Sequence, residues 1–347
     1  MAARYVIHIG PHKTGSTYLQ HAFTQMRTEL REHGIDYPDL WGGLHGHMAL
    51  MDHLASGDAV ALQAAFNLLT DRSEYETILL SSETLAYCTD AQVRLLRGLL
   101  RGAPVTIVFY VRRWSELIPS HWREVLKHGS RESLQGFALK YMFSPATSEI
   151  VNFALVLGRY ATAFGADNLR LASYNAIAEA GEDLLSHFCR CFLNWPDPPP
   201  NMLGRVNESL DMVDCEVIRT LNALEYVRAG DEGVPLYHRY MALKPELPIG
   251  WIVDQSMQFA VNPMRFDDAA LGLADLHDRI ANQYRYALVP PCPGGRLFSP
   301  RAADVLYVHP DYVLRPGILG KMQDIHARLL AANANDAEHQ RRYDDAS

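Results

Sequence analysis

The chain has 347 residues, 48% of them hydrophobic, and a formal net charge of −8 with histidine neutral. This length and apolar content allow a large buried core and exclude extensive disorder, while the acidic balance argues against a nucleic-acid partner, which would require a surplus of cationic side chains. No apolar run approaches the ~18 residues of a membrane-spanning helix, and no secretory signal precedes the first apolar segment. We therefore expect a cytoplasmic protein whose 5 cysteines are reduced.

The first part of the chain alternates between predicted strands and predicted helices. Apolar runs rich in β-branched and aromatic residues predict buried strands over 4–9, 77–82, 104–111 and 168–174. The first strand is followed by a helix that ends at Gly34 and carries on one face Leu19, Phe23, Met26 and Leu30. Further helices are predicted over 90–101 with Asp90 as N-cap, and over 114–128, 131–142, 148–164 and 181–194.

A proline-rich stretch, WPDPPP at 195–200, ends this alternating part, because consecutive prolines cannot continue a helix. Beyond it the pattern predicts helices over 210–229, 254–260 and 267–287, a loop over 288–317 and a tail that frays after about 335. Alternating strands and helices imply a parallel sheet covered on both faces. We predict a three-layer α/β/α sandwich over 1–200, and a mostly helical part of the same domain over 201–347.

The segment HIGPHKTGSTYLQ, residues 8–20, joins the first predicted strand to its helix. A strand that passes through a glycine-bearing turn into a helix directs backbone N–H groups at one point, and the helix dipole adds positive charge there. Lys13 adds a full charge, and Ser16 and Thr17 add hydroxyl donors, so we predict an anion-binding loop. It departs from the usual nucleotide-binding loop, because Lys13 precedes Gly15 where that loop has lysine after its last glycine.

Two other residues stand in equivalent positions after other predicted strands. Glu83 and Arg112, like Lys13, follow the carboxyl end of a predicted strand. Ligands of open parallel sheets bind at that edge, so we expect the three side chains to meet there. A kinase would also need Mg²⁺, usually held by an aspartate after a second apolar strand. Glu83 occupies that position here, and no metal-ligand set is predicted.

The loop segment PHKTGSTYLQ resembles the 5′-phosphosulfate loop of sulfotransferases that use 3′-phosphoadenosine 5′-phosphosulfate (PAPS), whose pattern is close to P-K-[ST]-G-[ST]-T-x-L. In that family an arginine after a strand and a serine eight residues later bind the 3′-phosphate. VFYVRRWSELIPS places Arg112 and Ser120 at that spacing, with Arg113-Trp114 where the family usually has Asn-Pro. LLSSETL resembles the strand-end glutamate of carbohydrate sulfotransferases, and RVNESLD, from Arg205, resembles an Arg-x-Asn-x-Ser stretch of bacterial members.

The resemblance, which spans about 1–210, implies a P-loop NTPase-like sulfotransferase fold of the bacterial, carbohydrate-sulfotransferase-like type. PAPS would be the sulfuryl donor and adenosine 3′,5′-bisphosphate the product, and the helical C-terminal part would cover both nucleotide and acceptor. Lys13 would stabilise the charge that develops on the leaving phosphate oxygen, and Glu83 would be the general base. The residues expected to bind the nucleotide are Lys13, Thr14, Gly15, Ser16, Thr17, Tyr18, Arg112, Ser120 and Arg205.

The histidine-rich segment LHGHMALMDHL leaves the identity of the base open. Its histidines, His45, His47 and His53, could serve as surface or packing residues, as an acceptor contact or auxiliary base, or as metal ligands, and His47 is the rival to Glu83. Trp114 and Trp122 are similarly open between stacking on an adenine and packing in the core.

The acceptor is equally open: a neutral glycan, a glycolipid, or a small alcohol or phenol, sulfated at a hydroxyl or an amine. Two other functions compete with a sulfotransferase. One is an ATP-dependent small-molecule kinase on the same fold, and the other is a catalytically silent nucleotide-binding module.

Overall fold

The structure, a computed structural model, describes residues 3–41, 46–70, 74–100, 102–198, 210–247, 249, 264–266, 271–291, 293–299, 301, 303–305, 310–315 and 317–344. Internal contacts divide the chain into two compact units. Unit 1 comprises Met1–Leu117, Tyr141–Asn207 and Leu271–Arg301. Unit 2 comprises Ile118–Lys140, Glu208–Ala270 and Ala302–Ser347, so the two units are built from segments that alternate along the sequence.

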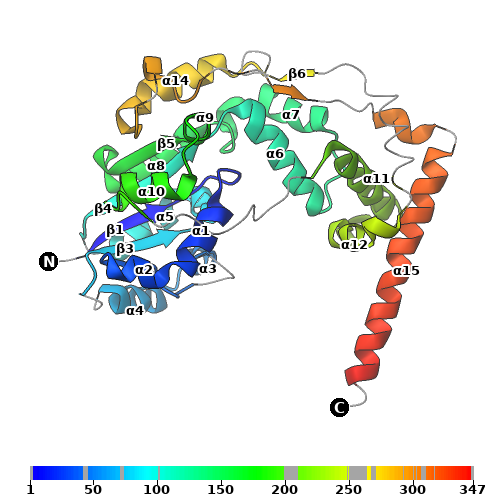
Figure 1. Ribbon diagram of the computed structural model, residues 1–347, viewed down its shortest axis with the longest axis horizontal. Helices are drawn as coiled ribbons and strands as arrows, with labels where there is room; N and C mark the ends of the chain where they lie inside the picture. Colours follow the sequence, from blue (N-terminus) through cyan, green and yellow to red (C-terminus); the bar gives the residue numbers. More distant parts are fainter. Residues whose placement is uncertain are drawn as a thin grey trace. The chain divides into compact units, whose positions relative to one another are not determined.

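Unit 1 contains a five-stranded sheet in the order β2-β3-β1-β4-β5, and every neighbouring pair is parallel (Figure 1). The strands are β1 (Arg4–His8), β2 (Ile35–Asp36), β3 (Thr77–Ser81), β4 (Val105–Val111) and β5 (Leu169–Ser173). The predicted α/β class with a central parallel sheet is thereby confirmed. Strand β1 lies at the centre, and the register pairs His8 with Ser81 on one side and with Val108 on the other, so the carboxyl ends of β1 and β3 lie level.

One face of the sheet is covered by α1 (Ser16–Gln25), α2 (Arg27–Glu32), α9 (Tyr174–Glu179) and α10 (Leu184–Phe192). Successive strand residues point to opposite faces, so Val6 of β1 and Tyr110 of β4 lie in the same buried cluster as Phe23 of α1 and Phe188 of α10. The rings of Phe23 and Phe188 lie 5.0 Å apart between their centroids. This cluster fixes α1, and with it the loop that precedes it, on the sheet.

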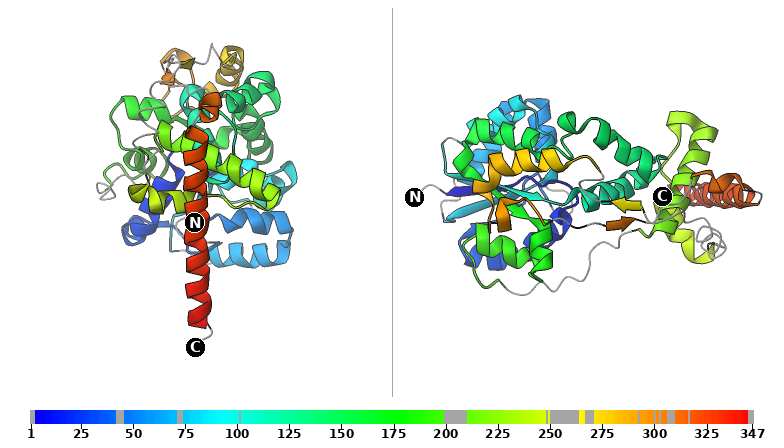
Figure 2. Two further views of the ribbon diagram at one scale, coloured as in Figure 1. Left: turned by 90° about the vertical axis from the view of Figure 1, so that its right-hand side faces the viewer. Right: turned by 90° about the horizontal axis from the view of Figure 1, so that it is seen from above.

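The opposite face carries α3 (Ala49–Ser56), α4 (Ala59–Thr70), α5 (Asp90–Leu99) and α8 (Phe153–Phe164). Tyr5 of β1 lies 6.4 Å from Phe66 of α4, and Phe109 of β4 lies 5.6 Å from Phe153 of α8, both measured between ring centroids. Figure 2 shows helices on both sides of the sheet. Unit 1 also contains α14 (Ala274–Tyr284).

Unit 2 is mainly helical in its described part. It holds most of α6 (Trp114–Lys127) and α7 (Leu134–Phe143), and all of α11 (Met212–Ala229), α12 (Tyr237–Leu243) and α15 (Ile318–Asp344), together with a short antiparallel pair, β6 (Met264–Phe266) and β7 (Ala303–Val305). Helices α11 and α15 are joined by a hydrogen bond between Glu225 and His326, with 2.9 Å between Oε2 and Nε2. None of the helices among the described residues is long and apolar enough to cross a bilayer.

Two predictions about helix ends were wrong. The helix expected to continue to Gly34 is broken at Met26, which separates α1 from α2. The N-cap of α5 is Thr89 rather than Asp90, because Thr89 and Gln92 form a reciprocal capping box, in which Gln92 Oε1 accepts the Thr89 N–H at 2.7 Å. Helix α15 continues through the tail to Asp344. The helix predicted over 254–260 lies outside the described residues.

Candidate functional site

The loop between β1 and α1 has a backbone shape that its sequence explains. Three of its residues have a positive φ: 94° at Gly10, 66° at Lys13 and 84° at Gly15. Gly15 is the N-cap of α1, whose first turn contains no acidic side chain. A positive φ is unusual for a residue other than glycine, so Lys13 is held in this conformation by its surroundings.

Hydroxyl groups close the loop on itself. Thr14 Oγ1 donates to the Pro11 carbonyl at 2.7 Å, and Ser16 Oγ donates to the same oxygen at 3.3 Å. Thr17, the next residue of α1, is exposed. The hydroxyl of Tyr18 donates to the carboxylate of Asp183, which caps α10 by accepting the Ser186 N–H at 3.0 Å. The loop and the start of α1 are therefore held in place from several directions.

Glu83 lies directly against the loop. It follows β3 and begins a short 3₁₀ helix, Glu83–Tyr87. A Cβ atom added to Gly10 would lie 2.9 Å from the Glu83 Cβ and 3.0 Å from its Cα, so only glycine allows the two segments to approach this closely. The Ser82 N–H also donates to the His8 carbonyl at 3.0 Å, which joins the ends of β3 and β1.

The carboxylate of Glu83 is largely buried and has a specific donor. The residue is 8% exposed, and Gln20 Nε2 of α1 donates to its Oε2 at 2.6 Å. Its other oxygen, Oε1, lies 3.9 Å from His12 Nδ1, and the His12 ring lies 5.5 Å from that of Tyr87 between centroids. Neither Gln20 nor His12 was predicted from the sequence to belong to the site. A signal for Gln20 existed, because it lies four residues after Ser16 and three before Phe23, on the buried face of α1.

Arg112 approaches the loop from β4, on the other side of β1. Its Nη1 donates to the carbonyl oxygen of Lys13, and its guanidinium lies 4.9 Å from the centroid of the Tyr174 ring. Its Nη2 is 3.6 Å from Glu116 Oε2. The structure therefore brings Lys13, Glu83 and Arg112 to one edge of the sheet, as their positions after the strands predicted.

Arg113 occupies the position where the sulfotransferases usually have asparagine, and here it is a buried structural residue. It is 1% exposed and its guanidinium donates to Glu116 Oε1 at 2.6 Å, to Glu179 Oε1 at 2.5 Å and to the Ser299 carbonyl at 2.8 Å. A buried arginine neutralised in this way holds separate segments of unit 1 together. Trp114 and Trp122 are buried as well, and their indole N–H groups donate to the carbonyls of Val151 and Glu132, respectively. Of the two alternatives for these residues, packing in the core is therefore the one observed.

Both ring nitrogens of His47 are hydrogen-bonded, one to the end of β3 and the other to the segment after β2. Its Nδ1 accepts the Ser81 N–H at 3.0 Å, and its Nε2 donates to the Pro38 carbonyl at 2.9 Å. The residue is 1% exposed, and burial lowers the pKa of His47 to about 4. The ring is thus neutral near pH 7 and engaged on both sides.

Four other site residues were predicted from the sequence. Ser120 lies on α6 in unit 2 and is partly exposed, His53 is exposed on α3, and Arg205 and His45 lie outside the described residues. Across the part of the chain that the structure describes, no three His, Cys, Asp or Glu side chains are grouped as a metal site requires.

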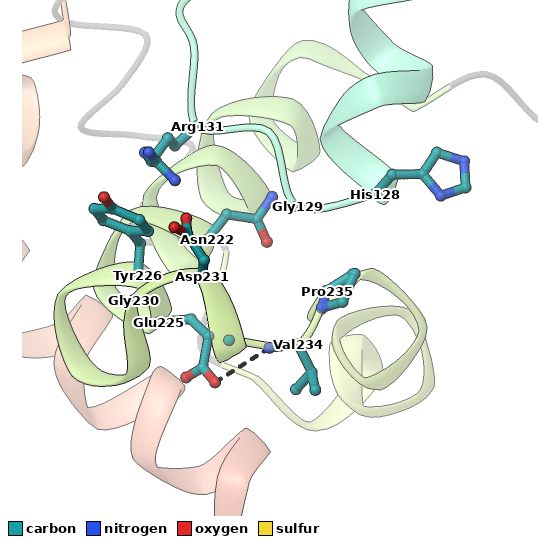
Figure 3. Close-up of a pocket in the computed structure, with 11 residues that line it drawn as sticks. His128, Gly129, Arg131, Asn222, Glu225, Tyr226, Gly230, Asp231, Val234 and Pro235 are labelled. Atoms are coloured by element: carbon teal, nitrogen blue, oxygen red, sulfur yellow. Dashed lines mark hydrogen bonds between the residues drawn. The ribbon is translucent and has the colours of Figure 1, made fainter.

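Unit 2 contains a separate hollow of about 170 Å³ (Figure 3). In its wall the Arg131 guanidinium lies 3.4 Å from the centroid of the Tyr226 ring, and Glu225 Oε1 accepts the Val234 N–H at 3.4 Å. None of the residues that line it belongs to the predicted site.

No protein-family model and no curated protein matches this sequence. The function is therefore argued from the site itself.

Proposed function

We propose that the protein is a PAPS-dependent sulfotransferase, built on a P-loop NTPase-like sulfotransferase fold, that moves a sulfuryl group to a hydroxyl or amine of an acceptor. The observation that carries the proposal is the double contact of one loop: Gly10 packs on Glu83, while the Lys13 carbonyl accepts a hydrogen bond from Arg112. The cations Lys13 and Arg112 and the carboxylate of Glu83 thus lie around a turn that is suited to binding an anion.

The loop fits a phosphate or phosphosulfate group. Gly15 is the N-cap of α1, so the first N–H groups of the helix and its dipole are directed at the loop. A Cβ atom on Gly15 would lie 2.4 Å from Leu184 Cδ2, so a larger residue would have to displace that side chain, and the φ of 84° also favours glycine here. Lys13 and the exposed Thr17 add a charge and a hydroxyl donor to this cradle.

The proposed reaction is an in-line transfer that needs a proton acceptor and a stabilised leaving group. PAPS, when bound, supplies the sulfuryl group: the bond from its sulfur to the bridging phosphate oxygen breaks, and a bond from sulfur to the acceptor oxygen or nitrogen forms. Lys13 and the N–H groups of α1 stabilise the electron pair left on the phosphate oxygen. Glu83 takes the proton released by the acceptor.

The surroundings of the two candidate bases favour Glu83 over His47. For His47 to accept a proton at Nδ1, the bond from the Ser81 N–H would have to break, and the low pKa of the ring opposes protonation. Glu83 accepts a hydrogen bond from Gln20 at Oε2 and lies against the phosphate loop. If Glu83 is the base, Glu83→Gln lowers turnover by about 10²–10⁴-fold with near-normal nucleotide binding. An active Glu83→Gln with an inactive His47→Ala would assign the proton to His47.

Nucleotide binding separates this proposal from its two rivals. We expect adenosine 3′,5′-bisphosphate to raise the melting temperature more than AMP or ATP with Mg²⁺, through the 3′-phosphate contacts that the resemblance implies for Arg112 and Ser120. Transfer of labelled sulfate from PAPS should then be measured on a neutral glycan, a glycolipid and a phenol, with and without EDTA.

The outcomes are distinct. Transfer that persists in EDTA supports the sulfotransferase. A preference for ATP, with phosphoryl transfer that stops in EDTA and resumes with Mg²⁺, would establish the kinase instead. Nucleotide binding without transfer to any acceptor of the panel would favour the silent binding module.

A further inference from the structure

The carboxylate of Glu83 accepts a hydrogen bond from α1, the helix that follows the phosphate loop. Gln20 is 4% exposed, and its Nε2 lies 2.6 Å from Glu83 Oε2. An ionised carboxylate only accepts hydrogen bonds, so the amide of Gln20 must turn its NH₂ group toward Glu83. This bond to a charged acceptor is of the stronger kind and fixes both the position and the rotation of the carboxylate.

The backbone at Gly46 packs against the Gln20 amide and holds it in this position. A Cβ atom on Gly46 would lie 2.7 Å from Gln20 Cδ and 2.8 Å from its Oε1, so the amide is confined between Gly46 and Glu83. The next residue, His47, fixes the backbone at Gly46 to β3, because the His47 N–H donates to the Ser81 carbonyl at 2.9 Å and its ring accepts the Ser81 N–H. His47 thereby has a structural task at the site.

The two oxygens of Glu83 are consequently not equivalent. Oε2 is engaged by Gln20, whereas Oε1 lies on the side of His12, a residue of the phosphate loop, at 3.9 Å from its Nδ1. We propose that Gln20 is a positioning residue that holds Oε2 so that Oε1 is the oxygen that takes the proton of the acceptor. This inference rests on the proposed sulfotransferase function and assigns Gln20, Gly46 and His47 to the support of its base.

The test is a double-mutant cycle on the full chain, with PAPS and the best acceptor of the panel. Gln20→Leu, similar in size but without the donor, should lower kcat by about 10–100-fold, because the reacting group loses its fixed geometry. The KM for PAPS and the affinity for adenosine 3′,5′-bisphosphate should stay within about twofold. In the Glu83→Gln background the same change should cause little further loss, since the two residues act as a unit.

Two further variants isolate the cause. Gly46→Ala keeps the Gln20 side chain but displaces its amide, so it should lower kcat in the same direction. Gln25→Leu removes an exposed glutamine from the same helix, where it bonds to His21, and should leave the kinetics unchanged. If Gln20→Leu fails to fold, Gly46→Ala decides.

The outcomes distinguish this inference from the function on which it rests. A wild-type protein that transfers no sulfate would refute the proposed function. A wild-type protein that transfers sulfate while Gln20→Leu or Gly46→Ala retains full kcat would overturn the positioning role. A Gln20→Leu variant whose nucleotide affinity falls as far as its kcat, or whose loss adds fully to that of Glu83→Gln, would also overturn it.

Discussion

The contact between the β1–α1 loop and Glu83 can be tested by adding a single methyl group, with Gly10→Ala. Two costs are expected. An L-residue at a φ of 94° is strained by about 1–2 kcal/mol. The new Cβ would also lie 2.9 Å from the Glu83 Cβ and 3.0 Å from the Glu83 Cα, which is backbone and cannot rotate away. Overpacking of this kind costs about 1–3 kcal/mol, so the total is about 2–5 kcal/mol.

Gly57 provides a matched control, because alanine at this position would be strained but not crowded. It has a φ of 70° at the end of α3, and a Cβ atom added there would meet nothing within 4 Å. Gly57→Ala therefore carries only the conformational strain, and the effect of each substitution on the unfolded chain is the same. The free energy of unfolding should fall by about 1–3 kcal/mol more in Gly10→Ala than in Gly57→Ala.

Urea unfolding followed by circular dichroism measures this difference. With a slope near 3 kcal/mol per molar urea, the midpoint of Gly10→Ala should lie about 0.3–1 M below that of Gly57→Ala. Turnover should fall at least about tenfold in Gly10→Ala only, because the loop moves relative to the proposed base. Equal midpoints and equal turnover in the two variants would refute the close approach of the loop to Glu83.

The other predictions concern charge. Lys13→Ala should lower kcat by about 10²–10³-fold and nucleotide affinity much less, because Lys13 is proposed to face charge that develops only in the transition state; half of wild-type turnover in the purified variant would contradict this. Arg112→Ala should abolish the preference for adenosine 3′,5′-bisphosphate over AMP in calorimetry, and a wild type without that preference would rule out the 3′-phosphate site. Burial lowers the pKa of His8 to about 3 and that of His47 to about 4, so the unfolded chain binds more protons below pH ~6.5. The contribution of these histidines to the free energy of unfolding is fully present above that pH and is lost as the pH falls toward 4, by about 2 kcal/mol per histidine at pH 5. A melting temperature unchanged between pH 7 and pH 5 would contradict this prediction.

The sheet was largely predictable because buried parallel strands appear as continuous apolar runs. The runs over 77–82 and 104–111 became β3 and β4 almost residue for residue. Strand β2 was missed, since Ile35 and Asp36 are too few to form a run and are recognised as a strand only by pairing with β3. The break at Met26 was hidden for a related reason: Leu30 continues the apolar spacing of α1 although the backbone turns.

The site was predictable only where strand ends determine position. Lys13, Glu83 and Arg112 each follow a strand, and parallel strands bring their carboxyl ends to one edge whatever the intervening sequence. Gln20 and Gly46 obey no such rule. Gln20 meets Glu83 because α1 packs on the sheet beside β3, and Gly46 reaches Gln20 because His47 is bonded to Ser81. Contacts of this type depend on packing between distant segments, which spacing along the chain does not encode.

The central position of β1 gives the loop two chemically different sides. After β1 the chain moves to β2 and β3 on one side, then crosses to β4 and β5 on the other, so the direction of strand order reverses at the loop. The β3 side presents the carboxylate of Glu83, and the β4 side presents the guanidinium of Arg112. A carboxylate repels a polyanionic nucleotide and a guanidinium attracts it. Under the proposed function we therefore expect the nucleotide to extend toward β4 and the acceptor to approach from β3, with the transferred group over the loop between them.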